Sequence, residues 1–228
     1  FKTWTSAPGA GECPCTIFGQ TVPTSVSVTD PSEIELGVKF RASSDGFVAA
    51  IRFYKGASNT GPHTVTLWSG AGAELATTPV YFESASGWQT AYFAAPVPVS
   101  AGATYVASYH TVTGNYSATI GQFNTPVVNG PLTGLQDGVD GGNGVYLYGS
   151  RGFPTSSFSA SSYAVDVVFT TPPDTTAPTV ASSAPGANAT SVPVSVAPSI
   201  TLSESVVPSS VQLSLAGPSG AVAGAVAL

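Results

Sequence analysis

The sequence is 228 residues long, rich in small and apolar residues, and poor in charge. Charged residues make up 8% of it, and 25 glycines and 19 prolines interrupt it throughout, which argues against long helices. Six basic residues against twelve acidic ones give a net charge of −6, so we expect no nucleic-acid partner, and no stretch has the apolar length that membrane insertion requires.

Residues 1–12 show no hydrophobic periodicity and are predicted to form a leader or linker. The next three residues, Cys13-Pro14-Cys15, contain both cysteines of the chain. The pair is too small and too closely spaced for a structural zinc site, so we predict a disulfide between Cys13 and Cys15. A pair of thiols is the alternative, because so small a ring removes little unfolded-state entropy and leaves little room for disulfide geometry.

Residues 13–170 contain short runs rich in Val, Ile, Phe, Tyr and Thr, each bounded by Gly, Pro, Asn or Asp, and such runs predict β-strands. They are residues 34–40, 46–54, 63–68, 74–82, 89–93, 104–110, 144–148 and 163–169. The first two runs flank a Ser-Ser-Asp-Gly turn and predict a hairpin. The whole set predicts an all-β fold, a jelly-roll-like antiparallel β-sandwich over residues 13–170.

Residues 114–158 differ from the rest of this domain, because apolar residues are sparse and Gly, Asn and Pro interrupt every run. We predict a long loop with one short strand here. Loops of this length are usually functional or disordered, so we expect ligand specificity to reside in this region.

A Pro- and Thr-rich linker at residues 171–178 ends the domain. Residues 179–228 contain no basic or aromatic residue, and their strand-like patterns predict the N-terminal part of an immunoglobulin-like β-sandwich. Because such domains need about 100 residues, we expect this one to be incomplete as given. The first domain is then expected to be a monomeric module within a longer chain.

Several motifs occur together in a familiar order. They are Cys13-Pro14-Cys15, Glu35-Leu36-Gly37-Val38-Lys39-Phe40, Ile51-Arg52-Phe53-Tyr54-Lys55-Gly56, Gly142-Asn143-Gly144-Val145-Tyr146 and Val165-Asp166-Val167-Val168-Phe169. In this order they resemble the uncharacterised domain family 4082 of secreted multidomain bacterial proteins, over about residues 13–170. Residues 174–180, Asp-Thr-Thr-Ala-Pro-Thr-Val, resemble the start of a bacterial immunoglobulin-like repeat. The resemblance implies a secreted or cell-wall-associated protein and supplies no activity.

The residues that common catalytic sites need are sparse. His63 and His110 are the only histidines, no Gly-x-Ser-x-Gly turn occurs, and no spacing is typical of zinc ligands. A glycosidase needs a pair of carboxylates beside the scissile bond, but nothing in the spacing of the acidic residues singles out a pair. We therefore predict that the domain is not an enzyme, with a polysaccharide-active enzyme domain as an alternative.

Aromatic and polar residues near the predicted turns favour carbohydrate binding. Sugar rings present apolar C–H faces that stack on aromatic rings, while their hydroxyls exchange hydrogen bonds with polar side chains. The candidate ligand-binding residues are Tyr54, Asn59, His63, Trp68, Tyr109, His110, Tyr146 and Arg151, with Tyr148 and Phe153 close to the last two. Burial is the alternative for Trp68, and a structural role is the alternative for the two histidines.

Three acidic residues are candidates for a structural calcium site, because calcium prefers carboxylate and carbonyl oxygens. Glu35 and Asp166 lie in an early and in the last predicted strand, and Asp45 is a weaker candidate. Apolar residues flank Asp166, and an unpaired buried carboxylate is costly, so we expect a cation or a basic partner such as Lys39 or Arg52 beside it. Alternation alone would instead place Asp166 on the solvent face.

These observations predict a non-catalytic carbohydrate-binding module of a secreted or cell-wall-associated multidomain protein. It would tether that protein to a polysaccharide or cell-wall glycan and so raise the effective concentration of its neighbours. The alternative from another class is a structural or adhesive stalk module with no small ligand, in which the aromatic residues belong to the core.

Overall fold

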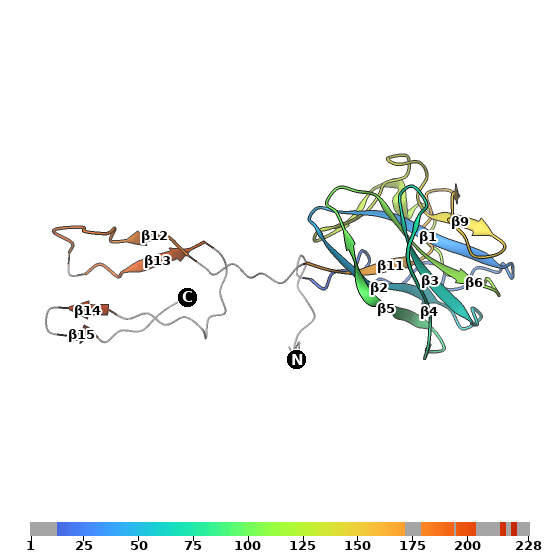
Figure 1. The fold of residues 1–228 in the computed structure, drawn as a ribbon, viewed down its shortest axis with the longest axis horizontal. Coiled ribbons are helices and arrows are strands. Elements are labelled where there is room, and N and C mark those ends of the chain that lie inside the picture. Colours follow the sequence, from blue (N-terminus) through green and yellow to red (C-terminus); the bar gives the residue numbers. More distant parts are fainter. Residues whose placement is uncertain (1–12, 172–178, 194, 204–214, 218–219, 223–228) are drawn as a thin grey trace. The chain divides into compact units, whose positions relative to one another are not determined.

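The computed structural model describes residues 13–171, 179–193, 195–203, 215–217 and 220–222 (Figure 1). The chain divides into two compact units, residues 1–172 and residues 173–228. In the described residues the elements are β-strands, apart from one 3-10 helix, η1 (Gln122–Asn124). A helix with the length and apolar composition to cross a membrane does not occur in these ranges. The predicted leader and nearly all of the predicted linker lie outside the described residues.

The first unit contains an eight-stranded and a three-stranded sheet. The larger sheet consists of β1 (Ile34–Ala42), β3 (His63–Ser69), β4 (Glu74–Pro79), β6 (Tyr105–Thr111), β7 (Val127–Asn129), β8 (Leu132–Gly134), β9 (Val145–Tyr148) and β10 (Ser156–Ser157). The smaller sheet consists of β2 (Gly46–Lys55), β5 (Gly87–Val99) and β11 (Val165–Thr170).

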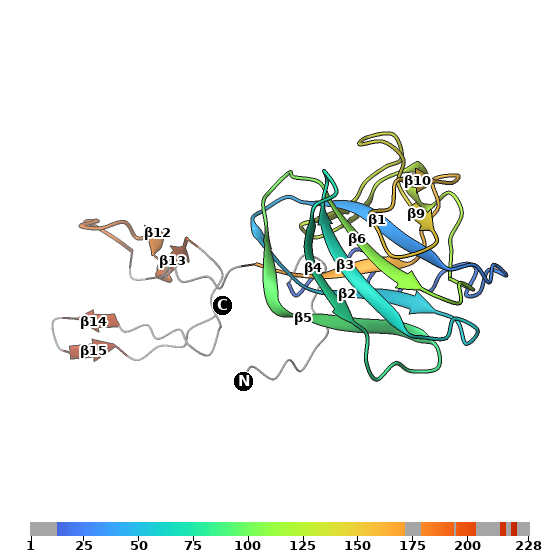
Figure 2. The same ribbon diagram turned by 45° about the vertical axis from the view of Figure 1, so that its right-hand side comes forward.

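The strands pair antiparallel in a nested order, in which the first of six strands pairs with the last and each inner pair lies within the outer one along the sequence (Figure 2). β1 pairs with β6, β2 pairs with β5 and β3 pairs with β4, while the pairing of β3 with β6 closes the larger sheet. β9 extends the larger sheet from β1, and β11 extends the smaller sheet from β2. This is a jelly-roll-like sandwich, so the predicted fold class is confirmed.

The core lies between the two sheets and follows the two-residue period of strands. Buried core residues of the first and last strands are Ile34, Leu36, Val38 and Phe40 of β1 and Val165, Val167 and Phe169 of β11. Burying an apolar side chain of this size contributes about 1.5–3 kcal/mol. Because alternate side chains point to opposite faces, Glu35 and Asp166 are directed to the outer faces of two different sheets.

The predicted hairpin between residues 34–40 and 46–54 is wrong, because β1 and β2 belong to different sheets. The Ser-Ser-Asp-Gly segment is an arch that carries the chain from one sheet to the other. Asp45 in this arch accepts a hydrogen bond from the backbone N–H of Ala101, at 2.8 Å. At Gly46 a Cβ atom would lie 2.3 Å from the ring of Phe169, so the close approach of the core ring requires glycine there.

Residues 114–158, predicted to form a long loop with one short strand, contain the four short strands β7 to β10. β7 and β8 form a hairpin whose turn contains Gly130, with a φ of 56°, and Pro131. The glycine and proline that interrupt the apolar pattern are therefore the turn residues of a hairpin. The strand predicted over residues 144–148 is β9, whereas sequence periodicity missed β7, β8 and β10 because each spans only two or three residues.

A buried amide attaches this glycine-rich region to the sheet. Asn143 Oδ1 accepts hydrogen bonds from the backbone N–H groups of Lys39 (2.8 Å) and Gly144 (2.7 Å). Its Nδ2 donates to the carbonyl oxygens of Lys39 (3.0 Å) and Leu135 (2.6 Å). One side chain thus bonds both backbone groups of a β1 residue, as a neighbouring strand would, immediately before β9 begins.

The predicted disulfide between Cys13 and Cys15 is wrong, because the two residues carry thiols in the structure. Burial raises the pKa of Cys15 to about 12, and a hydrogen bond with the Cys13 side chain adds to the shift. The physical reason is the small size of the ring that a disulfide would close. A ring with one intervening residue offers little room for disulfide geometry and little entropic gain.

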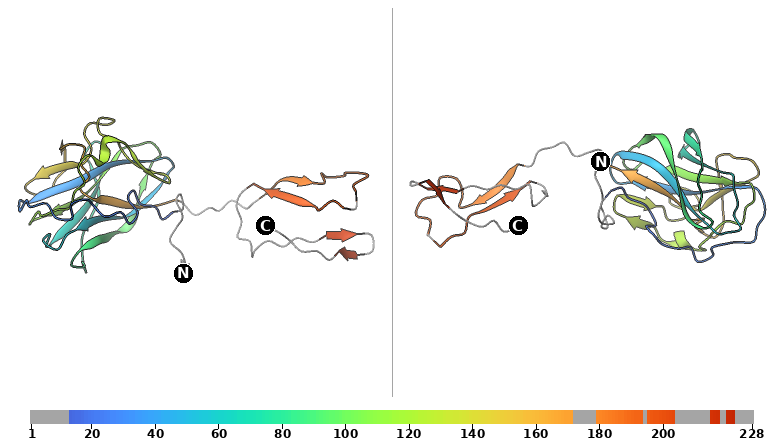
Figure 3. Two further views of the ribbon diagram at one scale, coloured as in Figure 1. Left: turned by 180° about the vertical axis from the view of Figure 1, so that it is seen from behind. Right: turned by 90° about the horizontal axis from the view of Figure 1, so that it is seen from below.

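The described residues of the second unit form two antiparallel pairs of short strands (Figure 3). β12 (Val180–Ala184) pairs with β13 (Ser199–Leu202), and β14 (Leu215–Gly217) pairs with β15 (Gly220–Val222). The all-β class predicted for this part of the chain is confirmed.

The four hydrogen bonds of Asn143 predict a large loss of stability for Asn143→Ala. The substitution leaves backbone groups of β1 and of the glycine-rich region without partners, and each such buried group costs about 1–3 kcal/mol. We expect the free energy of unfolding to fall by about 3 kcal/mol or more, measured by urea denaturation.

Asn129→Ala is the matched control, since Asn129 Nδ2 makes one hydrogen bond, to the Thr16 carbonyl at 2.9 Å. Its loss should be about 1 kcal/mol. Equal losses for the two variants would contradict the anchoring role of Asn143.

Candidate functional site

Three of the predicted ligand-binding residues form a buried hydrogen-bond network. His63 Nε2 lies 2.8 Å from Asn59 Oδ1, Asn59 Nδ2 lies 3.3 Å from the Tyr109 hydroxyl, and all three residues are at most 1% exposed. His63 Nδ1 lies 2.8 Å from Glu83 Oε1, and burial lowers the pKa of His63 despite this carboxylate. Their prediction as ligand contacts is wrong, because buried side chains that satisfy one another cannot meet a glycan; the structural role stated for His63 is confirmed.

Trp68 is also buried, as its alternative prediction states. Its indole Nε1 donates to Ser108 Oγ at 2.8 Å, and its ring packs edge-to-face against Phe153 with 5.7 Å between centroids. This contact lies on the outer face of the larger sheet, where Val106 and Val145 complete a second small apolar cluster. The indole therefore closes a cluster instead of stacking on a ligand.

Three further candidates lie on separate parts of the first unit. Tyr54 packs edge-to-face against Trp88 at 5.7 Å, and His110 Nε2 lies 3.2 Å from the Glu33 carboxylate. Arg151 forms an ion pair of 2.7 Å with Glu74. The structure thus does not gather these residues into one site.

The acidic residues predicted to share a calcium ion lie apart. Asp166 pairs with Arg52 at 3.5 Å, the basic partner considered as an alternative, and accepts hydrogen bonds from three backbone N–H groups. Burial raises its pKa to about 6 against the lowering effect of Arg52. Glu35 lies on the larger sheet and accepts a hydrogen bond of 2.5 Å from Ser108 of the same sheet, while Asp45 is exposed in its arch. Among the described residues, no three His, Cys, Asp or Glu side chains form a group that could hold a metal.

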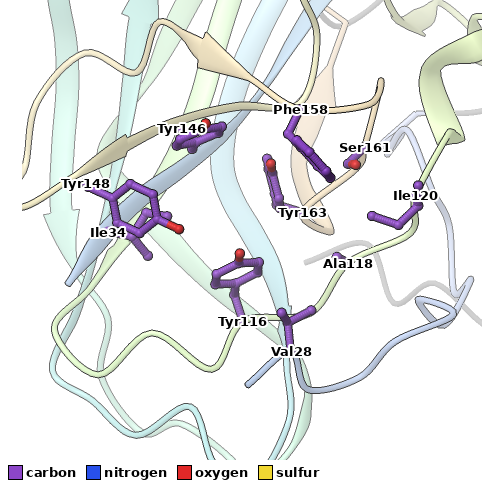
Figure 4. Close-up of a pocket in the computed structure, with 10 residues that line it drawn as sticks. All are labelled: Val28, Ile34, Tyr116, Ala118, Ile120, Tyr146, Tyr148, Phe158, Ser161 and Tyr163. Atoms are coloured by element: carbon purple, nitrogen blue, oxygen red, sulfur yellow. The ribbon is translucent and has the colours of Figure 1, made fainter. Parts of the chain in front are cut away.

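A pocket of about 290 Å³ is lined by several aromatic residues at one place on the first unit (Figure 4). Its lining residues are Val28, Ile34, Tyr116, Ala118, Ile120, Tyr146, Tyr148, Phe158, Ser161 and Tyr163. Of the predicted ligand-binding residues, Tyr146 is in this set, together with the neighbouring Tyr148. We refer to it as the tyrosine pocket.

Backbone hydrogen bonds between distant segments build the tyrosine pocket. The N–H of Val28 donates to the Tyr116 carbonyl at 2.8 Å, which joins the segment before β1 to the segment after β6. Thr119 and Ser162 form an isolated antiparallel bridge, which joins the latter segment to the residues before β11. Three irregular segments thus supply most of the lining, and β1 and β9 supply the rest.

Strand alternation places two of the tyrosines. Tyr146 and Tyr148 are two residues apart on β9, so their rings lie on one face, with centroids 5.5 Å apart. Tyr163 packs perpendicular to Tyr146 and to Tyr116, with interplanar angles of 86° and 87°. These edge-to-face contacts fix four rings around the space seen in Figure 4.

A carboxylate contacts the hydroxyl groups of two of these tyrosines. Asp30 Oδ2 accepts a hydrogen bond from the Tyr148 hydroxyl at 2.6 Å and a longer one from Tyr116 at 3.5 Å, while Oδ1 accepts from the Ser32 N–H at 3.1 Å. Burial alone would raise the pKa of Asp30, but these hydrogen bonds lower it below its ordinary value. The hydrogen bond to Asp30 raises the pKa of Tyr148. The carboxylate is therefore charged and the phenol neutral at neutral pH.

Ser161 provides a polar atom inside the lining. Its side chain is fully buried, and its Oγ has no hydrogen-bond partner in the structure. Leaving a buried hydroxyl without a partner costs about 1–3 kcal/mol, which a ligand hydroxyl could recover.

Sequence reasoning missed Tyr116, Phe158, Ser161 and Tyr163. The sequence predicts a strand that begins at Tyr163, and Tyr116 lies in the region predicted to be loop, 47 residues away along the chain. The available signal was the spacing of Tyr146 and Tyr148, which predicts one aromatic face on a short strand. Their partners come from segments that the sequence does not connect.

Comparison with known families gives two matches. A family model described as Domain of unknown function (DUF4082) matches residues 20–165, and a model described as Bacterial Ig-like domain matches residues 174–226. The Ig-like match agrees with the predicted second domain and suggests a structural or adhesive module. No curated protein matches the chain.

Because Glu35 is buried, the free energy of unfolding should depend on pH. Burial raises its pKa from 4.5 to about 7, although the Ser108 hydroxyl and the charge of Arg151 act in the opposite direction. Between these pH values the folded protein holds a proton that the unfolded chain releases, so the free energy of unfolding falls as pH rises. We expect a fall of up to about 3 kcal/mol between pH 4.5 and 7, measured by urea denaturation.

Glu35→Gln, which cannot ionise, should lack this part of the fall. Asp166 adds a similar fall at lower pH in both proteins, because its pKa is also raised, to about 6. The difference between the two proteins therefore isolates Glu35, and parallel curves would show that its carboxyl is not protonated in the folded state.

Proposed function

Because the chain belongs to the family described as Domain of unknown function (DUF4082), whose description assigns no activity, we propose a function from the pocket itself. The first unit is a non-catalytic carbohydrate-binding module, and the tyrosine pocket is its binding site. The observation that carries this proposal is a set of four tyrosines around one pocket, with a buried serine hydroxyl that lacks a partner.

The chemistry of the lining suits a sugar. Aromatic rings offer faces for sugar C–H groups, and the phenol oxygens and Ser161 Oγ offer hydrogen-bond partners for sugar hydroxyls. The volume of about 290 Å³ is at the lower end of the range for small-molecule sites. It suits one or two sugar residues at the end of a glycan.

The proposal of a binding site without catalysis rests on the same lining. Glycoside hydrolysis needs two carboxyl groups on either side of the scissile bond. The lining contains no acidic residue, and the nearby Asp30 is engaged by two phenols and a backbone N–H. The lining of the pocket therefore supplies neither a general acid nor a nucleophile for a bound sugar.

We propose that the module works by tethering. Held beside a Bacterial Ig-like domain in a secreted or cell-wall-associated protein, it would keep neighbouring domains near a polysaccharide. The Ig-like match also favours a second candidate, a structural or adhesive stalk in which the first unit binds no glycan. Glycan binding distinguishes the two roles.

The test is a polysaccharide and glycan array screen with the 228-residue chain, followed by titration of the best ligand. Tyr148→Ala should weaken binding about tenfold or more, because it removes one ring face and a phenol oxygen from the pocket. Tyr148 is 52% exposed, so the fold should tolerate the change.

Tyr92→Ala is the matched control. Tyr92 is 66% exposed on β5 and outside the pocket, so its removal should leave the affinity unchanged. An equal loss of affinity in both variants would show that the binding site is not the tyrosine pocket. Failure to bind any glycan on a broad array would favour the stalk.

A further inference from the structure

The charge on Asp30 has no basic partner among the described residues. Its hydrogen-bond partners are two phenols and Ser32, all neutral. The basic side chains of the described residues have other partners: Lys39 and Arg41 contact Asp140, Arg52 contacts Asp166, Lys55 contacts Glu83, and Arg151 contacts Glu74. A negative charge therefore lies 2.6 Å from the Tyr148 hydroxyl, and the lining of the tyrosine pocket contains no basic residue.

The hydrogen-bond directions add to this asymmetry. A phenol has one proton, and Tyr148 donates its proton to Asp30 at 2.6 Å. Its oxygen can therefore only accept a hydrogen bond from a ligand. A carboxylate, sulfate or phosphate on the ligand would meet an acceptor with a second negative charge behind it.

The ring faces favour the opposite charge. The face of an aromatic ring is negative, and cations within about 6 Å of it are attracted. Tyr116, Tyr146, Tyr148 and Tyr163 surround the pocket, with neighbouring centroids 5.5–6.2 Å apart (Figure 4). Enclosure by several rings beside a carboxylate is the arrangement that binds an organic ammonium group.

We propose that the tyrosine pocket selects a glycan with a free ammonium group, a de-N-acetylated hexosamine, over neutral and anionic glycans. The inference rests on the proposed function. The ammonium group contacts the ring faces and the oxygen of Tyr148, with Asp30 behind it, and Ser161 Oγ takes a hydroxyl of the sugar.

The test is calorimetric titration of the 228-residue chain with four tetrasaccharides at about pH 6, where the sugar amine is protonated. They are oligomers of glucosamine, N-acetylglucosamine, glucose with β-1,4 links, and galacturonic acid. The glucosamine oligomer should bind at least tenfold more tightly than either neutral oligomer, and the galacturonic acid oligomer should not bind.

Asp30→Asn separates a pocket effect from the general attraction of an acidic chain. It should weaken binding of the glucosamine oligomer about tenfold and leave the neutral oligomers unchanged. Asp45→Asn, at an exposed acid outside the pocket, should change neither. The thermal melting curves of Asp30→Asn and Asp45→Asn show whether each variant is folded, so that a folding defect is not mistaken for a lost ammonium contact.

The outcomes separate this inference from the proposed function. Equal affinity for glucosamine and neutral oligomers, or an equal loss in Asp30→Asn and Asp45→Asn, overturns the ammonium preference and leaves carbohydrate binding intact. Tightest binding of the galacturonic acid oligomer overturns it as well. Failure of every oligomer to bind overturns both.

Discussion

The register between β1 and β9 determines where the tyrosine pocket forms. Ile34 lies opposite Tyr148, and Leu36 lies opposite Tyr146, so the core face of β1 and the aromatic face of β9 are on the same side of the sheet. Slipping this pairing by one residue would turn both rings to the outer face, away from Tyr163. Asn143 holds the chain to β1 just before β9 begins, and it thereby fixes the register on which the pocket depends.

Most buried charged groups of the first unit have a partner of opposite charge or hydrogen-bond donors nearby, which is how the sandwich accommodates them. Asp166 has Arg52 and three N–H groups, and Glu83 has Lys55 and His63. Burying a charge is costly unless it is paired and hydrogen-bonded, so these contacts allow the outer faces to be covered by loops. Asp30 differs, because tyrosine hydroxyls rather than cations satisfy it, and its charge has no basic partner among the described residues.

The sequence predicts the strands better than their partners. Alternation in residues 34–40 predicts β1 and its core face, and the motifs around Glu35 and Asp166 predict the family that the comparison shows. The separation of Glu35 and Asp166 was not predictable, because strand alternation states which face a residue occupies but not which sheet its strand joins. In the nested pairing the first and last strands belong to different sheets. The pocket depends on long-range contacts of the same kind, such as Val28 with Tyr116 and Thr119 with Ser162, which no local pattern encodes.

The most direct test of this account is chemical-shift mapping of the 228-residue chain during titration with the glucosamine tetrasaccharide. The account predicts that the largest changes occur at Tyr116, Tyr146, Tyr148, Ser161 and Tyr163, with none at the buried network around His63. Changes confined to the outer face of the smaller sheet, near Tyr54 and Trp88, with the tyrosine pocket unaffected, would contradict it.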